Sequence, residues 1–273
     1  MLKVLFIGDV VGRLGREAVK KILPKLKKEL EPDLVIANAE NIAHGAGVSK
    51  GTLPELFGAG VDYCTTGDHA FDKEKQIDEC YKEGMNILRP ANYPPGVPGA
   101  GYAIINFKKG KEDYEMLLIN LVGRVFMNAN FDCPFRKLDE ILNQEDLSKK
   151  KNLAIIVDMH AEATAEKIIF RHYADGRVSA ILGTHTHVAT ADEEVTKKGT
   201  AYISDTGMVG SADGCIGVNK EEPLKNILTQ IKYKHVIPEK GRATFNAVLI
   251  TIDPKTGKAK GIKRVKRETE IGE

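Results

Sequence analysis

Residues 4–9 read Val4-Leu5-Phe6-Ile7-Gly8-Asp9, an apolar, strand-like run that ends in a glycine and a carboxylate. A continuous apolar run of this length is typical of a strand that is buried on both faces. Four later apolar runs also end in groups that bind metal ions, in residues 34–41, 65–69, 155–160 and 180–187. Ligands of open α/β sheets bind beyond the carboxyl ends of the strands. The recurrence therefore predicts a metal site that is assembled across one sheet edge.

Helix-like and strand-like segments alternate around these runs. The amphipathic stretch at residues 15–30 predicts a helix, which Pro24 should kink or divide because proline lacks the N–H that a helix needs. Residues 89–101 hold four prolines and three glycines, so we expect a loop there. Further helices are expected at residues 52–59, 73–83 and 163–170, and strands at 2–7, 34–37, 63–66, 102–107, 115–121, 153–157, 178–182, 200–204 and 247–252. This alternation predicts one domain over residues 1–273, a layered α/β (α+β) sandwich.

The charges of the chain are nearly balanced, with 40 Lys and Arg against 38 Asp and Glu. The resulting net charge of +2 gives no global attraction to nucleic acid or to an anionic membrane, so neither partner is expected. No apolar run approaches the roughly 20 residues that cross a bilayer, and no signal-like segment is evident before the first strand. The four cysteines form no C-x-x-C pair. We therefore expect a cytoplasmic protein with reduced thiols.

Seven side chains at the ends of the apolar runs are candidate metal ligands: Asp9, Glu40, Asn41, Asp68, His160, His185 and His187. Taken alone, Asp9 would be a helix cap and His160 a structural histidine. The i, i+2 spacing of His185 and His187 places both rings on one side of an extended segment, which favours metal binding. Imidazoles mixed with carboxylates suit iron, zinc or manganese better than magnesium or calcium. Seven groups exceed what one tetrahedral ion needs, so we expect two ions that share Glu40.

The ordered motifs resemble those of the calcineurin-like metallophosphoesterase superfamily, and more closely the bacterial YmdB-type family of cyclic-nucleotide phosphodiesterases. The resemblance rests on Gly8-Asp9, Asn38-Ala39-Glu40-Asn41, Gly67-Asp68-His69 and Gly183-Thr184-His185-Thr186-His187, and extends through residues 89–94, 158–162 and 213–218. It implies two mixed β-sheets flanked by helices. It also implies two transition-metal ions per chain, with iron preferred to manganese or zinc.

The same resemblance assigns the ligands to two ions. Asp9, Glu40, Asn41 and His187 would hold one ion, and Glu40, Asp68, His160 and His185 would hold the other. The family's usual Gly-Asn-His motif is Gly67-Asp68-His69 here. The extra carboxylate predicts tighter metal retention and weaker Lewis acidity.

A hydrolytic reaction follows from this assignment as a hypothesis. A hydroxide that bridges the two metals would attack phosphorus, and His69, which has no metal to bind, would protonate the leaving alkoxide as general acid. The substrate class implied by the family is a 2′,3′- or 3′,5′-cyclic nucleotide. We expect the 89–101 loop to present Asn92 and Tyr93 to this substrate, and His44 to lie at the mouth of the site.

Two other functions compete with this one. The glycines Gly8, Gly12 and Gly15 lie between a strand and a helix, as in a Rossmann nucleotide-binding domain, although the spacing differs and the three histidines stay unexplained. Alternatively, a metal-stabilised scaffold with little catalysis could bind RNA or a regulatory partner through the basic residues of 258–266. A solvated surface explains that basic run better than a nucleic-acid site does, and a homo-oligomer is compatible with either function.

Overall fold

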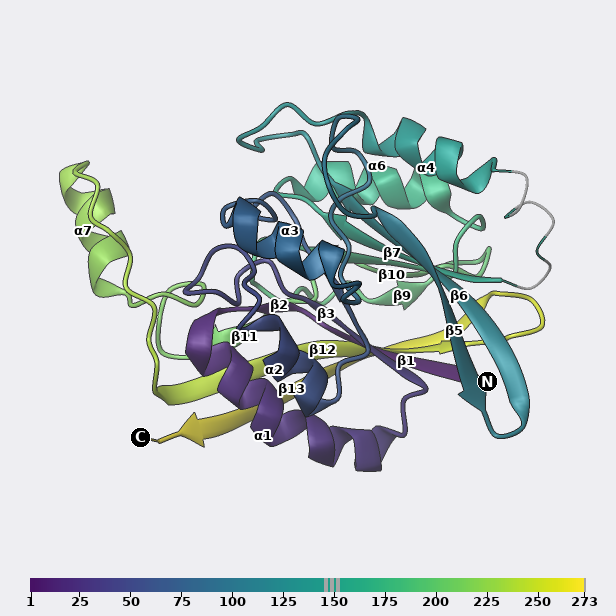
Figure 1. Cartoon of the computed structure of the whole chain (residues 1–273), viewed down its shortest axis with the longest axis horizontal. Helices are drawn as coiled ribbons and strands as arrows, with labels where there is room; N and C mark the ends of the chain where they lie inside the picture. The colour runs from purple at the N-terminus through teal and green to yellow at the C-terminus, as the bar shows by residue number, and fades with distance from the viewer. Residues whose placement is uncertain (145–146, 148–149, 151–152, 273) are drawn as a thin grey trace.

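Two β-sheets lie face to face between two layers of helices (Figure 1). The structure, a computed structural model, describes residues 1–144, 147, 150 and 153–272. Within these residues one sheet has seven strands and the other has six. The two mixed sheets and their flanking helices confirm the sandwich that the sequence predicts.

The seven-stranded sheet is built around the first strand of the chain. β1 (Leu2–Ile7) pairs in parallel with β3 (Leu34–Asn38), which pairs in parallel with β4 (Tyr63–Thr65). On its other side β1 pairs antiparallel with β12 (Gly241–Ile252), a strand from near the end of the chain. The sheet is completed by β2 (Asp9–Val10), β11 (Met208–Ser211) and β13 (Ala259–Ile271).

The six-stranded sheet has a parallel centre. β6 (Glu112–Val122), β7 (Ala154–His160), β8 (Ala180–Thr184) and β10 (Ala201–Ile203) are neighbours in that order and run parallel. The edges are β5 (Tyr102–Lys109) and β9 (Glu194–Val195). The carboxyl ends of parallel strands thus meet at one edge in each sheet, and these edges carry the candidate ligands.

Alternation along the strands divides the core into three layers. In β1, Leu5 and Ile7 pack against helices, whereas Val4 and Phe6 pack between the two sheets. The helices on the seven-stranded sheet are α1 (Gly12–Leu30), α2 (Leu53–Ala59) and α3 (Glu74–Lys82). Those on the six-stranded sheet are α4 (Pro134–Leu142) and α6 (Thr164–Ala174).

Several elements differ from the expectations. Pro24 does not divide its helix, because α1 continues through it. The chain does not close with residues 247–252, because β13 follows and includes most of the basic run at residues 258–266. A protruding helix, α7 (Glu221–Thr229), was not predicted (Figure 1).

The glycine pattern near the N-terminus serves chain packing. A Cβ at Gly8 would collide with the carbonyl oxygen of Gly207, and one at Gly15 with that of Val209. Two stacked sheets, in place of one doubly wound sheet, further disfavour the Rossmann interpretation. Within the described residues, no helix is both long and apolar enough to cross a membrane.

Candidate metal centre

Four of the predicted ligands form a close cluster between the two sheets. Glu40 and Asp68 follow β3 and β4 of one sheet, whereas His160 ends β7 and His185 follows β8 of the other. One ligand atom from each of the four lies within 4.8 Å of the others. The His160 Nε2 atom is 3.3 Å from Glu40 Oε1, 3.1 Å from Asp68 Oδ1 and 3.0 Å from His185 Nδ1. This donor set could hold a metal ion.

The other three predicted ligands lie beside this cluster. The Nδ2 atom of Asn41 is 3.1 Å from Glu40 Oε1 and 3.3 Å from His187 Nε2. A half-turn of this amide would present its oxygen, the metal-binding atom, at the same place. Asp9 Oδ1 is 3.8 Å from His187 Nε2. The structure therefore brings all seven predicted ligands together, with Glu40 between the two groups.

Charge at the site shows that a cation fits these residues. Asp9 Oδ1 is buried and has no hydrogen-bond partner among the described residues. Burial raises the pKa of Asp9 and outweighs His187 and His160, which would lower it. Burial alone would lower the pKa of His160, but the carboxylates of Glu40, Asp68 and Asp9 outweigh it and raise the pKa well above the usual value. The cluster thus has an excess of negative charge, which a metal cation would neutralise.

Gly67 allows the two sheets to approach at the site. A Cβ on this residue would collide with the His160 ring and with Glu40 Oε2. The lack of a side chain at this position is therefore what permits the close approach. Tyr93 supports the same loop from the other side, since its hydroxyl donates a hydrogen bond to the Asp68 carbonyl oxygen at 3.3 Å.

A buried hydrogen-bond chain orients the His160 ring. The Thr184 hydroxyl donates to Asp158 Oδ1 at 2.7 Å, so its oxygen can accept from His160 Nδ1 at 2.9 Å. The Nδ2 atom of Asn38 is also 3.4 Å from His160 Nδ1, but it lies closer to Asp158 Oδ2, at 3.2 Å. A proton on Nδ1 leaves the Nε2 lone pair directed at the cluster, as a metal ligand requires.

The segment that carries His185 and His187 is strained and tightly held. Both residues have positive φ, 98° and 65°, a conformation that costs a non-glycine residue about 1–3 kcal/mol. Asp205 Oδ2 accepts hydrogen bonds from the Thr186 amide at 3.0 Å and hydroxyl at 2.8 Å. The buried Lys167 Nζ donates to Asp205 Oδ2 and to the Thr184 carbonyl oxygen, each at 2.8 Å. This buried ion pair fixes the segment in its strained form.

His69 lies at the edge of the site. Its Nδ1 is 2.8 Å from Asp72 Oδ2, and the ring lines the same hollow as Glu40 and His185. Burial alone would lower the pKa of His69, but the nearby carboxylates of Glu40, Asp68 and Asp72 raise it above the usual value. The raised pKa favours a ring that holds a proton near neutral pH.

Comparison with known proteins places this site in a family. A family model described as "YmdB-like protein" matches residues 5–265. The 2′,3′-cyclic-nucleotide 2′-phosphodiesterase of Bacillus subtilis (strain 168) is 43% identical over 264 residues, which cover 97% of this chain and 96% of that protein. The chain belongs to the YmdB-like family.

Solved structures agree with the YmdB-like membership. The crystal structure of a novel phosphatase from Mycoplasma pneumoniae has a TM-score of 0.89 at 33% identity and covers 99% of this chain and 94% of its own. The calcineurin-like phosphoesterase YfkN from Bacillus subtilis shares the fold alone, with a TM-score of 0.58 at 12% identity, covering 99% of this chain and 90% of its own. The comparisons therefore support the predicted enzyme class, a metal-dependent phosphoesterase.

The three expected substrate contacts of this YmdB-like chain have other positions. Asn92 is fully buried, and its amide bonds the backbone of Val122 and Asp132. The expectation that Asn92 faces the substrate is therefore wrong, because this residue has a structural role. Tyr93 packs its ring against Phe71 and Phe131 behind the Asp68 loop. His44 is exposed beside Gly45, which lines the hollow, but does not itself line it.

Supporting residues of the YmdB-like site were not identified from the sequence. Lys167 and Asp205 are far apart in the chain and meet only in the fold. Glu162 Oε2 lies 3.1 Å from His185 Nε2 and fixes that ring from the outer side. The pairing of Asp72 with His69 could have been predicted, because Asp72 stands three residues after His69 in a turn.

Proposed function

We propose that this chain is a dinuclear-metal phosphodiesterase that hydrolyses cyclic nucleotides, with 2′,3′-cyclic nucleotides as the first candidates. The observation that carries the proposal is the cluster of Glu40, Asp68, His160 and His185, with Asp9, Asn41 and His187 beside it. The 43% identical Bacillus subtilis relative is a 2′,3′-cyclic-nucleotide 2′-phosphodiesterase, which supports the choice of substrate.

The ligand residues divide between two ions. Asp9, Asn41 and His187 would hold one ion, and Asp68, His160 and His185 the other, with Glu40 shared. Bound cations would supply Lewis-acid activation of water and neutralise charge on the phosphoryl oxygens. The mixed carboxylate and imidazole donors favour iron, with manganese or zinc as alternatives.

His69 would act as the general acid. Its Nδ1 is engaged by Asp72, which leaves Nε2 to hold the proton that the leaving alkoxide needs. The carboxylate of Asp72, which is outside the ligand set, supports the protonated form of this ring. Acid catalysis of this kind typically contributes about 10²–10⁴-fold.

Metal content and turnover test the proposal together. We expect two transition-metal ions per chain by elemental analysis, and hydrolysis of adenosine 2′,3′-cyclic monophosphate. Asp9→Ala should lose one ion and the hydrolysis. The control variant His172→Ala, which changes an exposed histidine outside the ligand set, should keep both ions and the hydrolysis. A purified protein that binds no transition metal, or a metal-loaded protein without phosphodiesterase activity, would contradict the proposal.

A leaving-group series tests the acid separately. His69→Ala should retain the metals but lose about 10²–10⁴-fold in kcat on the cyclic nucleotide. The loss should be small on an activated 4-nitrophenyl diester, because its leaving group needs no proton. Equal losses on both substrates would remove His69 from this role.

A further inference from the structure

A hollow of about 420 Å³ opens beside the ligand cluster. Its lining includes the predicted metal ligands Glu40, His185 and His187. The apolar part of its lining consists of Val11, Cys215, Ile216, Val218, Pro223 and Ile237. This volume lies within the range of small-molecule sites. A ligand that combines a phosphate with an apolar body would match both parts of the lining.

One wall of the hollow is the base of a protruding arm, defined as residues 219–238. The arm carries α7 away from both sheets (Figure 1), and none of the residues of α7 is buried. Its two ends are joined, because the Asn219 amide donates to the Val236 carbonyl oxygen at 2.8 Å. Ile237 packs so closely on Gly12 and Gly45 that a Cβ on either glycine would clash with it. The base of the arm is therefore held firmly against the site.

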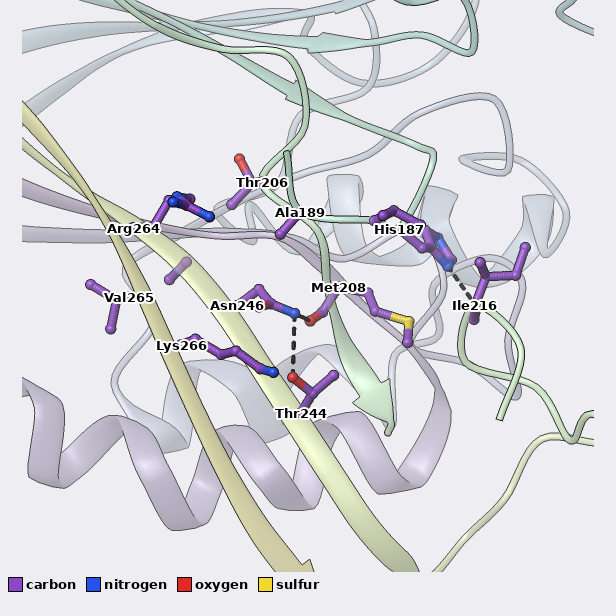
Figure 2. A pocket seen from close by; sticks show the side chains of 12 residues that line it. His187, Ala189, Thr206, Met208, Ile216, Thr244, Asn246, Arg264, Val265 and Lys266 are labelled. Carbon is purple, nitrogen blue, oxygen red and sulfur yellow. Dashed lines mark hydrogen bonds between the residues drawn. The ribbon is translucent and has the colours of Figure 1, made fainter. Parts of the chain in front are cut away.

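The loop of residues 215–218, which leads into the arm, also lines the hollow. Its Ile216 has φ of 44°, which is a strained conformation for a β-branched residue, and its side chain is 52% exposed. His187 Nδ1 lies 2.8 Å from the Ile216 carbonyl oxygen, which links this loop to a predicted metal ligand (Figure 2). The strained turn thus presents an apolar side chain next to the metal centre.

A second hollow, of about 350 Å³, also has His187 and Ile216 in its lining (Figure 2). Its cations are already paired: Arg264 with Glu193 at 2.8 Å and Lys266 with Glu268 at 3.0 Å. It shares only His187 with the seven predicted metal ligands. The first hollow is therefore the better place for the substrate.

We propose that the apolar part of the first hollow is a nucleobase subsite, in which the base packs against Ile216, Val218, Pro223 and Ile237. This inference rests on the proposed phosphodiesterase function and extends it to the base. His235, a polar residue of the arm, also lines the hollow, and its Nε2 lies 3.2 Å from Asn226 Nδ2. Apolar packing does not distinguish bases by hydrogen bonds, so the subsite accepts purines and pyrimidines but requires a base.

Paired substrates test the subsite in the metal-loaded enzyme. The two substrates are adenosine 2′,3′-cyclic monophosphate and its base-free counterpart, 1-O-methylribose 2′,3′-cyclic phosphate. For Ile216→Ala we expect the ratio of kcat/KM, nucleotide over base-free, to fall on the order of tenfold through a higher KM. Ile227→Ala is the matched control, since Ile227 is also an exposed isoleucine (71%), lies on the adjoining arm and does not line the hollow.

Adenosine binding provides a readout that needs neither metal nor turnover. Saturation-transfer NMR should detect contact with the adenine protons in the wild type and in Ile227→Ala, and weaker contact in Ile216→Ala. An unchanged kcat/KM ratio in Ile216→Ala, equal use of the base-free substrate by the wild type, or the same fall in Ile227→Ala would overturn the subsite. If the wild type hydrolyses neither substrate, the phosphodiesterase proposal fails, and adenosine contact alone decides the subsite.

Discussion

His185 and His187 combine a left-handed backbone with a predicted role in metal binding. Such strain persists only where neighbouring groups over-determine the backbone. Here the Lys167–Asp205 ion pair does so, because it bonds the residues on either side of His185. The strain energy of this segment is therefore offset by a buried ion pair that lies outside the predicted ligand set.

Breaking the pair should release the segment. We expect Asp205→Asn to lower the free energy of unfolding by about 3–5 kcal/mol, because it leaves the buried Lys167 ammonium without a counter-charge. Urea denaturation measures the loss. The double variant with Lys167→Met should be less destabilised than the sum of the two single changes. Additive losses would show that the two groups do not act as a pair.

Asp68 is the predicted ligand at which this chain departs from the asparagine that the resemblance implies. Burial alone would raise its pKa, but contacts with His160 and His185 hold the pKa well below the usual range. We expect Asp68→Asn to release metal to a chelator faster, on the order of tenfold, and to raise kcat on a phosphodiester. Asp72→Asn, which removes a carboxylate outside the ligand set, should keep the metal. Slower metal release from Asp68→Asn would contradict the expectation.

Elements with strong apolar patterns could be predicted from the sequence, and weakly patterned ones could not. β1, β3, β7 and β8 are buried nearly throughout, so their apolar runs are continuous. β13 has few buried residues and many charged ones, so its sequence predicts a solvated basic run and not a strand. α7 buries nothing, and β2 and β9 have two residues each, which is too short for any periodicity.

Pro24 is the clearest local conflict within an element. It lies on the exposed side of α1 and removes one backbone hydrogen bond from the middle of a 19-residue helix. We expect Pro24→Ala to raise the free energy of unfolding by about 1–3 kcal/mol, measured by chemical denaturation. The neighbouring exposed change Lys25→Ala should alter stability by less than about 0.5 kcal/mol. A loss of stability in Pro24→Ala would mean that the proline serves the fold.

At the scale of the whole molecule, the gathering of the seven predicted ligands could be foreseen because each lies at or just beyond the end of a strand-like run. Parallel strands end at one edge, so sequence position alone places Asp9, Glu40 and His185 together. The buried Lys167–Asp205 pair and the arm at the hollow depend on long-range packing that no local pattern records. The predicted substrate contact of Asn92 is wrong for the same reason, since the backbone groups that Asn92 bonds lie 30 and 40 residues away in the chain.

The ligands come from both sheets, so bound metal should stabilise the whole sandwich. We expect chelation to lower the melting temperature. At a free metal concentration of 100 times the dissociation constant, each site adds about 2.7 kcal/mol to the free energy of unfolding. Calorimetry with and without chelator measures the shift. Asp9→Asn should reduce it, whereas His172→Ala should leave it unchanged. The same melting temperature in both conditions would contradict a metal that bridges the sheets.

The pairing of β1 with β12 has a consequence for biosynthesis. Residues 2–7 leave the ribosome first, yet one edge of this strand waits for residues 241–252, synthesised some 240 residues later. Until then the nascent chain cannot complete the sheet that carries Asp9, Glu40 and Asp68. We therefore expect metal binding to follow the synthesis of residues 241–252, and a chain that stops short of residue 241 to lack the β12 edge of this sheet.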